Sequence, residues 1–267
     1  MKNRKRFAAG FIGCGNMGGA LATALAKANA PMLLNDANEE KAQALAEALG
    51  AQTGTLKDVA QTCGTVFLAV KPQQLPGVLE ELKRELGMRE ILLVSMAAGV
   101  TIRTIEAILP LPIVRIMPNT PVSVGKGMIL YDRNAHVSSE KLNALLSDMR
   151  FAGRWEFLSE ALIDAACAVS GCGPAYFFMM LDALADGAVA CGLPREKALL
   201  CAAATMEGAA ALYLASNTHP GALKDAVCSP GGSTIAGVRV LEEQGFSGAV
   251  MDAVIAAYKR NQELGKH

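Results

Sequence analysis

The sequence predicts an α/β protein in which a doubly wound, mainly parallel sheet is followed by an all-α domain. As far as about Pro121, apolar strand-like runs alternate with helical runs, and this alternation is typical of a parallel sheet covered by helices. From about Glu160 onward strand patterns are absent and alanine-rich helical runs take over. We therefore expect one domain over residues 1–159 and a helical domain over residues 160–267.

The first strand and helix are joined by a glycine-rich turn. Gly13, Gly15 and Gly18 have the G-x-G-x-x-G spacing directly after an apolar run. In a Rossmann fold the first glycine permits a tight turn, the second admits a pyrophosphate, and the third lets the helix pack closely on the strand. Phosphate is favoured there by the unpaired N–H groups and the dipole of the helix. The spacing predicts a dinucleotide-binding Rossmann domain, and the alternative is an ordinary strand–helix turn.

The other elements of this domain follow in order along the chain. The expected first helix ends near Asn29, and further helices cover residues 39–49, 75–86, 102–109 and 139–149. Expected strands cover residues 31–36, 65–70, 91–95, 113–117, 127–130 and 154–157. Ligands of parallel sheets bind outside the carboxyl ends of the strands. This rule selects residues 70–72, 96–99 and 117–121 as the segments that face a cofactor.

The second expected strand ends in Asn35 and Asp36, where a dinucleotide fold reads the adenosine ribose. An acid at this point accepts a hydrogen bond from a free 2′-hydroxyl and repels a 2′-phosphate. Asp36 therefore favours NAD on physical grounds. Two alternatives stay open: Asn35 takes the reading position, or these residues cap the helix over residues 39–49.

Two helical runs of the second domain are apolar on nearly every side. They cover residues 175–191 and 198–215, and a helix that is apolar all round has to be buried. A domain of about a hundred residues buries only about 60–65% of its surface by itself. We expect these helices to pack against a second copy of the chain. The alternative is that they cover the sheet of their own chain.

A second candidate site lies in residues 228–234, before the helical run of residues 235–241. Gly231 and Gly232 expose backbone N–H groups there, and Ser233 and Thr234 stand at capping positions. This arrangement suits a small carboxylate, and plain helix capping is the alternative. Residues 170–176 form a similar element, in which Pro174 would occupy the first helical turn.

Composition excludes several classes of function. The net charge of zero argues against nucleic-acid or membrane-surface binding, and the basic residues 2–6 are expected to be a solvated terminus. No signal peptide and no uninterrupted apolar run of roughly 18 residues is found. The seven cysteines contain no C-x-x-C pair and only three histidines are present, so we expect no metal site and a reduced, cytoplasmic protein.

A Rossmann domain followed by a helical domain suggests hydride transfer from a nicotinamide cofactor. Reduction of a ketone usually requires a strong proton partner. His136 and His219 do not lie on obvious catalytic elements, and His267 ends the sequence. Reduction of an imine does not require such a strong proton partner, because the imine nitrogen is readily protonated. The Thr234 hydroxyl could hold or relay that proton. The residues alone thus predict reduction of a small C=N compound that carries a carboxylate.

The sequence resembles the pyrroline-5-carboxylate reductase family along nearly its whole length. The matching segments, in order, are residues 11–17, 69–72, 97–101, 117–121, 170–176, 181–187, 219–221, 223–225 and 229–234. The resemblance implies a helical dimerisation domain that interleaves with a second subunit, giving a homodimer or larger rings of dimers. It also implies reduction of L-1-pyrroline-5-carboxylate to L-proline, the last step of proline synthesis, with NADPH.

Site residues follow from the resemblance segment by segment. The pyrophosphate turn would consist of Ile12, Gly13, Cys14, Gly15, Asn16 and Met17. The other cofactor contacts would be Asn35, Asp36, Ala69, Val70, Lys71, Pro72, Ala97 and, near the nicotinamide, Asn119. The substrate carboxylate would be held in the loop of Gly231, Gly232, Ser233 and Thr234, through the N–H groups of the last three. The Thr234 hydroxyl would approach the ring nitrogen as the catalytic group.

The chain departs from the family pattern at three points, one of which, residues 214–217, is assigned no role. Cys172 stands where the family usually has Ser, and we expect a small buried filler there. Asp36 stands where a 2′-phosphate binder has Ser or Arg. We nevertheless expect NADPH, with NADH as the second cofactor, because the family mostly prefers NADPH and Lys41 could reach the phosphate. The rival functions are another imine reductase, a 3-hydroxyacid dehydrogenase, or a non-catalytic nucleotide sensor.

Overall fold

The computed structural model describes residues 7–264, so the basic residues 2–6 lie outside the described part. The chain forms two compact units. The first contains the described residues up to Cys172 and from Ala257 onward, and the second contains residues 173–256. The units part after Cys172, whereas the boundary expected from the sequence lies after residue 159. That expected boundary stays a prediction.

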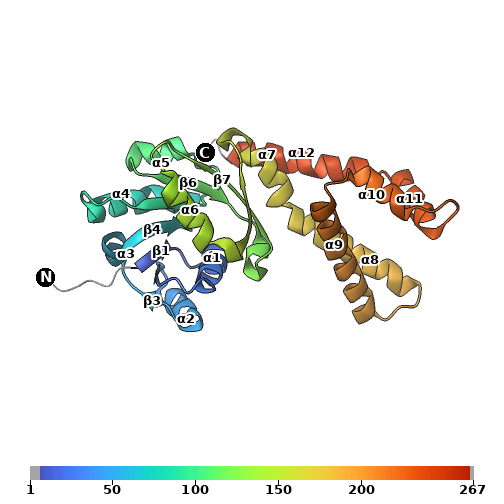
Figure 1. Cartoon of the computed structure of the whole chain (residues 1–267), viewed down its shortest axis with the longest axis horizontal. Coiled ribbons are helices and arrows are strands. Elements are labelled where there is room, and N and C mark those ends of the chain that lie inside the picture. The colour runs from blue at the N-terminus through green and yellow to red at the C-terminus, as the bar shows by residue number, and fades with distance from the viewer. Residues whose placement is uncertain (1–6, 265–267) are drawn as a thin grey trace. The chain divides into compact units, whose positions relative to one another are not determined.

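The first unit is built on one eight-stranded sheet with the order β3-β2-β1-β4-β5-β6-β7-β8. The strands are β1 (Phe7–Ile12), β2 (Met32–Asn35), β3 (Gln52–Thr53), β4 (Cys63–Leu68), β5 (Leu92–Ser95), β6 (Ile113–Met117), β7 (Gly127–Arg133) and β8 (Gly153–Phe157). Neighbouring strands are parallel except for β6 and β7. The predicted doubly wound, mainly parallel sheet is confirmed (Figure 1).

Helices cover both faces of this sheet. They are α1 (Asn16–Ala26), α2 (Glu39–Leu49), α3 (Leu56–Thr62), α4 (Leu75–Leu86), α5 (Ile102–Ile108), α6 (Ser139–Asp148) and α7 (Glu160–Ser170), with 3₁₀ turns η1 (Pro72–Gln74), η2 (Thr120–Val124) and η3 (Arg150–Ala152). One buried cluster joins the sheet to α1 and α6, and the other joins it to α3, α4 and α5. Both faces are therefore covered, as a parallel sheet requires.

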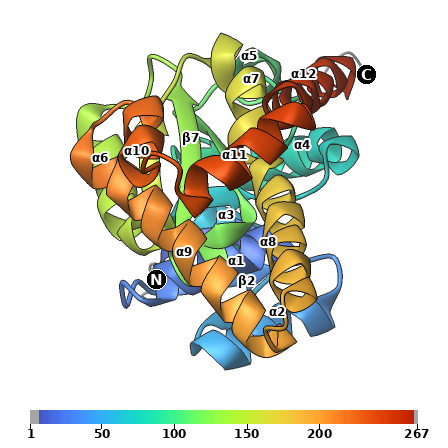
Figure 2. The same ribbon diagram turned by 90° about the vertical axis from the view of Figure 1, so that its right-hand side faces the viewer.

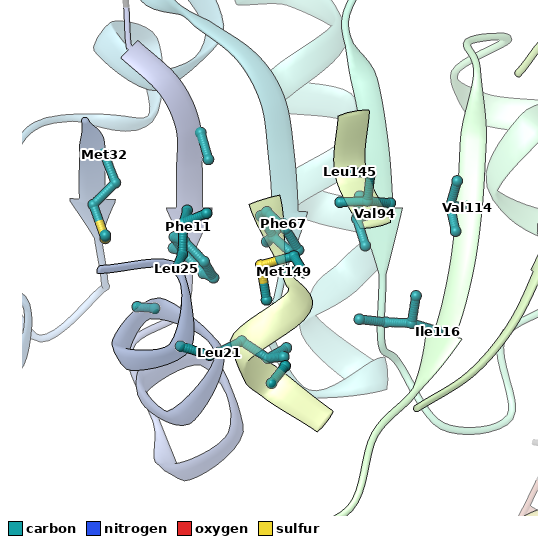
Figure 3. Close-up of a cluster of buried hydrophobic side chains, with 14 of the residues drawn as sticks. Phe11, Leu21, Leu25, Met32, Phe67, Val94, Val114, Ile116, Leu145 and Met149 are labelled. Atoms are coloured by element: carbon teal, nitrogen blue, oxygen red, sulfur yellow. The ribbon is translucent and has the colours of Figure 1, made fainter. Parts of the chain in front are cut away.

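Alternate residues of the central strands enter opposite clusters. Phe11 and Phe67 stack with ring centroids 4.5 Å apart on the α1 face, where Figure 3 shows them beside Leu21 and Leu25 of α1. Their successors Ile12 and Leu68 are buried on the other face. Burial on both faces explains why these strands read as continuous apolar runs in the sequence.

Several expected boundaries are confirmed and others move. The helices at residues 39–49 and 75–86 and the strand at 113–117 have the expected limits. The first helix ends at Ala26, and Asn29 has a left-handed φ of 56°. The strand expected at residues 65–70 spans Cys63–Leu68. The sequence analysis missed β3 and α3, although Thr55 and Asp58 form the capping box that starts α3.

A buried ion-pair network joins α7 to the sheet. Arg115 of β6 is only 3% exposed, and its guanidinium lies 2.9 Å from Glu160 Oε1 and 3.6 Å from Asp164 Oδ1. Glu160 Oε1 also accepts from the N–H of Ile102 at the start of α5. The N–H of Glu160 donates to Asp132 Oδ2 of β7 at 2.6 Å. These bonds tie β6, β7, α5 and α7 together around the buried guanidinium, whose partners Glu160 and Asp164 are partly exposed.

The second unit is all helical, as predicted, and contains α8 (Gly173–Ala190), α9 (Arg195–Ser216), α10 (Pro220–Val227), α11 (Ser233–Glu243) and most of α12 (Phe246–Leu264). Helices α8 and α9 lie side by side (Figure 2), and Pro174 stands in the first turn of α8 as expected. Only Gly173 and Ala185 of α8 are buried. Phe177, Phe178 and Met179 are 60–74% exposed, so one chain leaves this apolar surface uncovered.

Two stretches of the described chain are long and apolar enough to cross a membrane by length and composition alone. They are residues 160–190, with a mean hydropathy of 1.3, and residues 195–216, with a mean hydropathy of 1.6. The core helices of other proteins pass the same test, so this is weak evidence. The expectation that the chain has no membrane partner stays a prediction.

The Arg115 network generates a stability prediction. Glu160→Gln leaves the buried guanidinium with only one charged partner, Asp164 at 3.6 Å. We expect a loss of about 3 kcal/mol in unfolding free energy, because breaking a buried pair strands a charge. Guanidinium unfolding followed by the fluorescence of Trp155, the one tryptophan of the chain, measures this loss.

The matched control is Lys57→Met, which removes a surface pair with Glu85 at 3.8 Å from a side chain that is 60% exposed. Surface pairs contribute less than about 1 kcal/mol. An equal shift of the unfolding midpoint in both variants would contradict a special role of Arg115.

Candidate cofactor and substrate sites

The three glycines of the first turn each meet a different steric demand. Gly13 has φ +102°, and a Cβ there would lie 2.6 Å from the carbonyl oxygen of Ala69. A Cβ on Gly18 would lie 2.2 Å from the oxygen of Gly13. A Cβ on Gly15 would meet nothing within 4 Å. The first and third positions thus require glycine for packing, and the second leaves backbone open to a ligand.

The N-terminus of α1 keeps its donors free. Gly15 is the N-cap residue and no side chain caps the helix. Within the described residues, no acceptor binds the N–H groups of Asn16 and Met17. The N–H of Cys14 is used, because it donates to Asp36 Oδ2 at 2.6 Å. A phosphate group fits this cradle of free N–H groups at a helix start.

Asp36 and Asn35 have separate tasks at the end of β2. Besides its bond with Cys14, the Asp36 carboxylate accepts from the N–H of Asn38 at 2.8 Å. The Asn35 side chain donates to the oxygen of Gly54 at 3.0 Å. The N-cap of α2 is Asn38, so the alternative that Asn35 or Asp36 caps this helix is wrong. Of the two, Asp36 holds its carboxylate against the glycine turn.

An open groove of about 1140 Å³ runs along this edge of the sheet. Eight expected cofactor residues line it: Ile12, Gly13, Gly15, Asn35, Asp36, Ala69, Val70 and Lys71. Lys41 lines it too, together with Gly54, Thr55 and Gln74, which the sequence analysis did not select. Two of these residues could have been found from the sequence. Gln74 lies two residues after Pro72 in a selected segment, and Thr55 begins the capping box of α3.

The other expected cofactor residues lie outside the lining of this groove. Cys14, Asn16 and Met17 belong to the turn itself, Pro72 begins η1, and Ala97 and Asn119 follow β5 and β6. Asn119 is 9% exposed and uses both ends of its amide. Its nitrogen donates to the oxygen of Ser170 at 2.8 Å, and its oxygen accepts from the N–H of Met128 at 2.9 Å. Asn119 therefore fixes the end of α7 to the sheet edge.

Burial disfavours the thiolate form of two cysteines near these segments, Cys14 and Cys167. Burial, reinforced by the charge of Asp36, raises the pKa of Cys14 to about 11. Burial also raises the pKa of Cys167, whose carbonyl oxygen accepts from the N–H of Cys172 at 3.1 Å. Cys172 is half-buried, whereas we expected a small buried filler at this position. The raised pKa values of Cys14 and Cys167 do not favour a reactive thiolate at either residue.

The second candidate site forms a loop and helix start in the helical unit. Gly231 has φ +69°, Gly232 is the N-cap of α11, and no side chain caps this helix. The expectation that Ser233 and Thr234 stand at capping positions is wrong, since both lie inside the first turn. Within the described chain, no acceptor binds the N–H groups of Ser233, Thr234 and Ile235. Plain capping therefore does not account for this loop, and three donors stay free for an anion.

His219 has a structural task in the same unit. It is the N-cap residue of α10, and its Nδ1 accepts from the N–H of Gly221 at 3.1 Å. His136 is exposed and lies 3.5 Å from Glu106. Both positions agree with the expectation that neither histidine acts as the proton partner of a ketone reduction.

A Rossmann unit with this glycine cradle, followed by a helical unit with its own free helix start, defines the class: an oxidoreductase that uses a dinucleotide. The family model described as pyrroline-5-carboxylate reductase dimerisation matches residues 160–264. A second model, described as NADP oxidoreductase coenzyme F420-dependent, matches residues 8–99.

Relatives over the full length refine this class. A pyrroline-5-carboxylate reductase of Escherichia coli is 40% identical over 264 residues, which cover 96% of this chain and 98% of the relative. The solved structure of Plasmodium falciparum pyrroline carboxylate reductase with NADP bound is 31% identical, covers 99% of both chains and has a TM-score of 0.85. A pyrroline-5-carboxylate reductase structure from Coxiella burnetii is 35% identical, covers 97% of this chain and 99% of that chain, and has a TM-score of 0.88. The chain belongs to the pyrroline-5-carboxylate reductase family.

The glycine geometry predicts opposite outcomes for two alanine variants. In Gly15→Ala the added methyl group enters open space at φ −70°, so we expect less than about 1 kcal/mol of destabilisation but weaker dinucleotide binding. In Gly18→Ala the methyl group collides with the Gly13 oxygen, and we expect a loss of about 2 kcal/mol or more. Thermal unfolding and fluorescence titration with NADPH measure the two effects. Equal destabilisation by both variants would contradict the division of tasks.

Proposed function

We propose that this protein reduces L-1-pyrroline-5-carboxylate to L-proline with NADPH, and with NADH as the second cofactor. The observation that carries the proposal is the match to pyrroline-5-carboxylate reductases over nearly the whole of both chains. Two uncapped helix starts, one at Gly15 and one at Gly232, support it because the reaction joins two anionic molecules, a dinucleotide and a carboxylate.

The residues of the first unit fit a dinucleotide. The space above Gly15 and the free N–H groups of Asn16 and Met17 would receive the pyrophosphate. Ala69, Val70 and Lys71 would line the cofactor along the sheet edge. Ala97 and Asn119 follow the next strands and would lie toward the nicotinamide. When bound, the nicotinamide supplies the hydride.

Cofactor choice would depend on Asp36 and Lys41. The Asp36 carboxylate favours a free 2′-hydroxyl, whereas the exposed Lys41 ammonium on the same groove favours a 2′-phosphate. The Plasmodium falciparum relative was solved with NADP bound, which supports NADPH as the main cofactor. We infer that Lys41 outweighs Asp36, with the carboxylate partly neutralised by the N–H groups of Cys14 and Asn38.

The helical unit would bind the substrate. The N–H groups of Gly232, Ser233 and Thr234 are the donors assigned to the carboxylate, but that of Gly232 already donates to the oxygen of Ser229 at 3.0 Å. We therefore propose Ser233, Thr234 and Ile235 as the principal donors, with Gly231 and Gly232 shaping the loop. The Thr234 hydroxyl would hold the proton of the imine nitrogen.

The apolar helices support a homodimer, consistent with the dimerisation model over residues 160–264. We propose that a second copy, and not a membrane, covers Phe177, Phe178 and Met179, and that dimers join into a larger oligomer. The seven cysteines are all free thiols, which supports a reducing cytoplasm. We keep the domain boundary after residue 159, where the matched dimerisation region begins.

Steady-state oxidation of NADPH with racemic 1-pyrroline-5-carboxylate tests the activity, and a parallel assay with NADH gives the cofactor ratio. A nucleotide sensor would bind NADPH without turnover. A 3-hydroxyacid dehydrogenase would turn over a hydroxy acid, although α8 carries no lysine for that reaction. Absence of proline among the products would contradict the proposed activity.

Thr234→Ala is expected to lower kcat by about 10- to 1,000-fold, the typical effect of removing one positioning or proton-relaying group. NADPH affinity, measured by fluorescence titration, should stay nearly unchanged. Thr234→Ser keeps the hydroxyl and should retain most of the activity. Full activity of the alanine variant would remove Thr234 from the mechanism.

Asp36→Ser is expected to raise the ratio of kcat/KM for NADPH over NADH by about tenfold, because a like charge beside the 2′-phosphate is removed. Asp148→Ser is the control, since this exposed acid at the end of α6 does not line the groove. An unchanged ratio in Asp36→Ser would mean that this carboxylate does not face the ribose.

A further inference from the structure

We propose that Glu160 is a positioning residue, which holds residues 96–101 in place beside the cofactor through its hydrogen bond with the N–H of Ile102. The inference rests on the proposed function, in which this segment faces the nicotinamide. Glu160 is the first residue of α7 and does not line the groove. It therefore acts on the reaction through the backbone of another element.

The segment of residues 96–101 is fixed at its start by the sheet. It follows β5, and the N–H of Met96 donates to the oxygen of Leu68, the last residue of β4, at 3.2 Å. Ala97 is only 2% exposed, whereas Ala98 is exposed and Gly99 has a left-handed φ of 73°. The chain leaves the sheet at this turn, so its further course depends on where α5 begins.

The start of α5 is fixed from outside the helix. Thr101 is the N-cap residue, and its hydroxyl accepts from the N–H of Thr104, the third residue of the helix. The N–H of Ile102, the first residue, has no acceptor within a helix. It donates to Glu160 Oε1 at 2.8 Å, and 58 positions of the chain separate the two residues. A carboxylate suits this place, because it accepts a charge-assisted hydrogen bond at the positive end of the helix dipole.

The position of Glu160 does not depend on α5. Its own N–H donates to Asp132 Oδ2 at 2.6 Å, and its Oε1 also accepts from the buried guanidinium of Arg115 at 2.9 Å. Asp132 belongs to β7 and Arg115 to β6. The carboxylate is thus fixed to two strands of the sheet, and it sets the position of Ile102 instead of following it.

Apolar packing by itself does not define where the first turn of α5 lies. Ile102 is 8% exposed and Ile105 is fully buried, and both belong to the cluster that packs α5 on the sheet. Such packing is non-directional, and α5 has only seven residues. The hydrogen bond to Glu160 supplies the missing direction at the residue where the segment of residues 96–101 ends.

The consequence for the reaction concerns the cofactor and not the substrate. Without the bond to Ile102, residues 96–101 would shift beside the nicotinamide, and a misplacement of about 1 Å can lower a rate by about a hundredfold. The proposed donors to the substrate carboxylate belong to α11 in the second unit. We therefore expect Glu160 to affect kcat and the KM for NADPH, and to leave the KM for pyrroline-5-carboxylate unchanged.

Three variants separate positioning from stability. Glu160→Ala removes the acceptor, whereas Glu160→Gln keeps an acceptor oxygen for Ile102 and Arg115 without the charge. Asp164→Ala removes the other carboxylate partner of Arg115 and leaves the bond to Ile102 in place. We expect Glu160→Ala to lower kcat by about tenfold or more and to raise the KM for NADPH. Glu160→Gln and Asp164→Ala should keep wild-type kinetics while folded, although both lose stability.

These assays separate the inference from the proposed function. Wild-type kinetics of Glu160→Ala, an equal loss of kcat in Asp164→Ala, or no rescue by Glu160→Gln would each overturn the inference. A wild-type protein without turnover would instead contradict the proposed function.

Hydrogen exchange of the wild-type protein gives a test that needs no variant. Exchange is measured at single residues by mass spectrometry, without and with NADPH. We expect slow exchange at the N–H of Ile102, although the first N–H groups of a helix usually lack an acceptor, and slower exchange across residues 97–101 when NADPH is bound. Fast exchange at Ile102, or an unchanged rate across residues 97–101 in a protein that turns over, would overturn the inference.

Discussion

The first unit depends on a contact of backbone with backbone at the end of β1. Gly13 lies so close to Ala69, and Gly18 so close to Gly13, that no side chain fits at either glycine. This contact lets α1 begin directly after the glycine turn, next to Gly15, which lines the groove. Ala69 directly follows β4, and its N–H donates to the oxygen of Ile12 at 2.8 Å. This hydrogen bond joins the ends of β1 and β4 at the same point. As a result, the predicted cofactor residues at the ends of β1 and β4 lie close together.

The sheet edge is connected to α7 by polar contacts of two buried side chains, Arg115 and Asn119. Arg115 and Glu160 fix the start of this helix, and Asn119 fixes its end through Ser170. A helix held at both ends transmits the position of the sheet to residues 170–172, where the first unit ends. Both polar atoms of the Asn119 amide have a partner in the first unit, so the fold sets the orientation of this side chain.

The same physical device is used in both units. At α1 and at α11 a glycine takes the N-cap position, no side chain caps the helix, and N–H groups stay free. Such donors attract anions without a fixed positive charge. A chain with a formal net charge of zero can in this way hold a dinucleotide and a carboxylate. Selectivity would then come from the few charged groups nearby, Asp36 and Lys41 in the groove.

The sequence by itself determined the fold class and most of the elements, and it predicted the chemical type of each site. Glycine spacing, strand periodicity and the apolar helices predicted the Rossmann sheet, the helical unit and the loop before α11, because these signals are local. The short elements β3 and α3 were missed. β3 has two exposed residues and α3 has seven residues, and such short segments show little periodicity.

Only the tertiary structure decided which of two neighbouring residues performs a task. Asn35 and Asp36 look equivalent in sequence, and their separation depends on Gly54 and Cys14, which lie 19 and 22 residues away from them. The pairing of Arg115 with Glu160 also required the folded sheet. Such contacts depend on which segments meet in space, and a local pattern of residues does not contain that information.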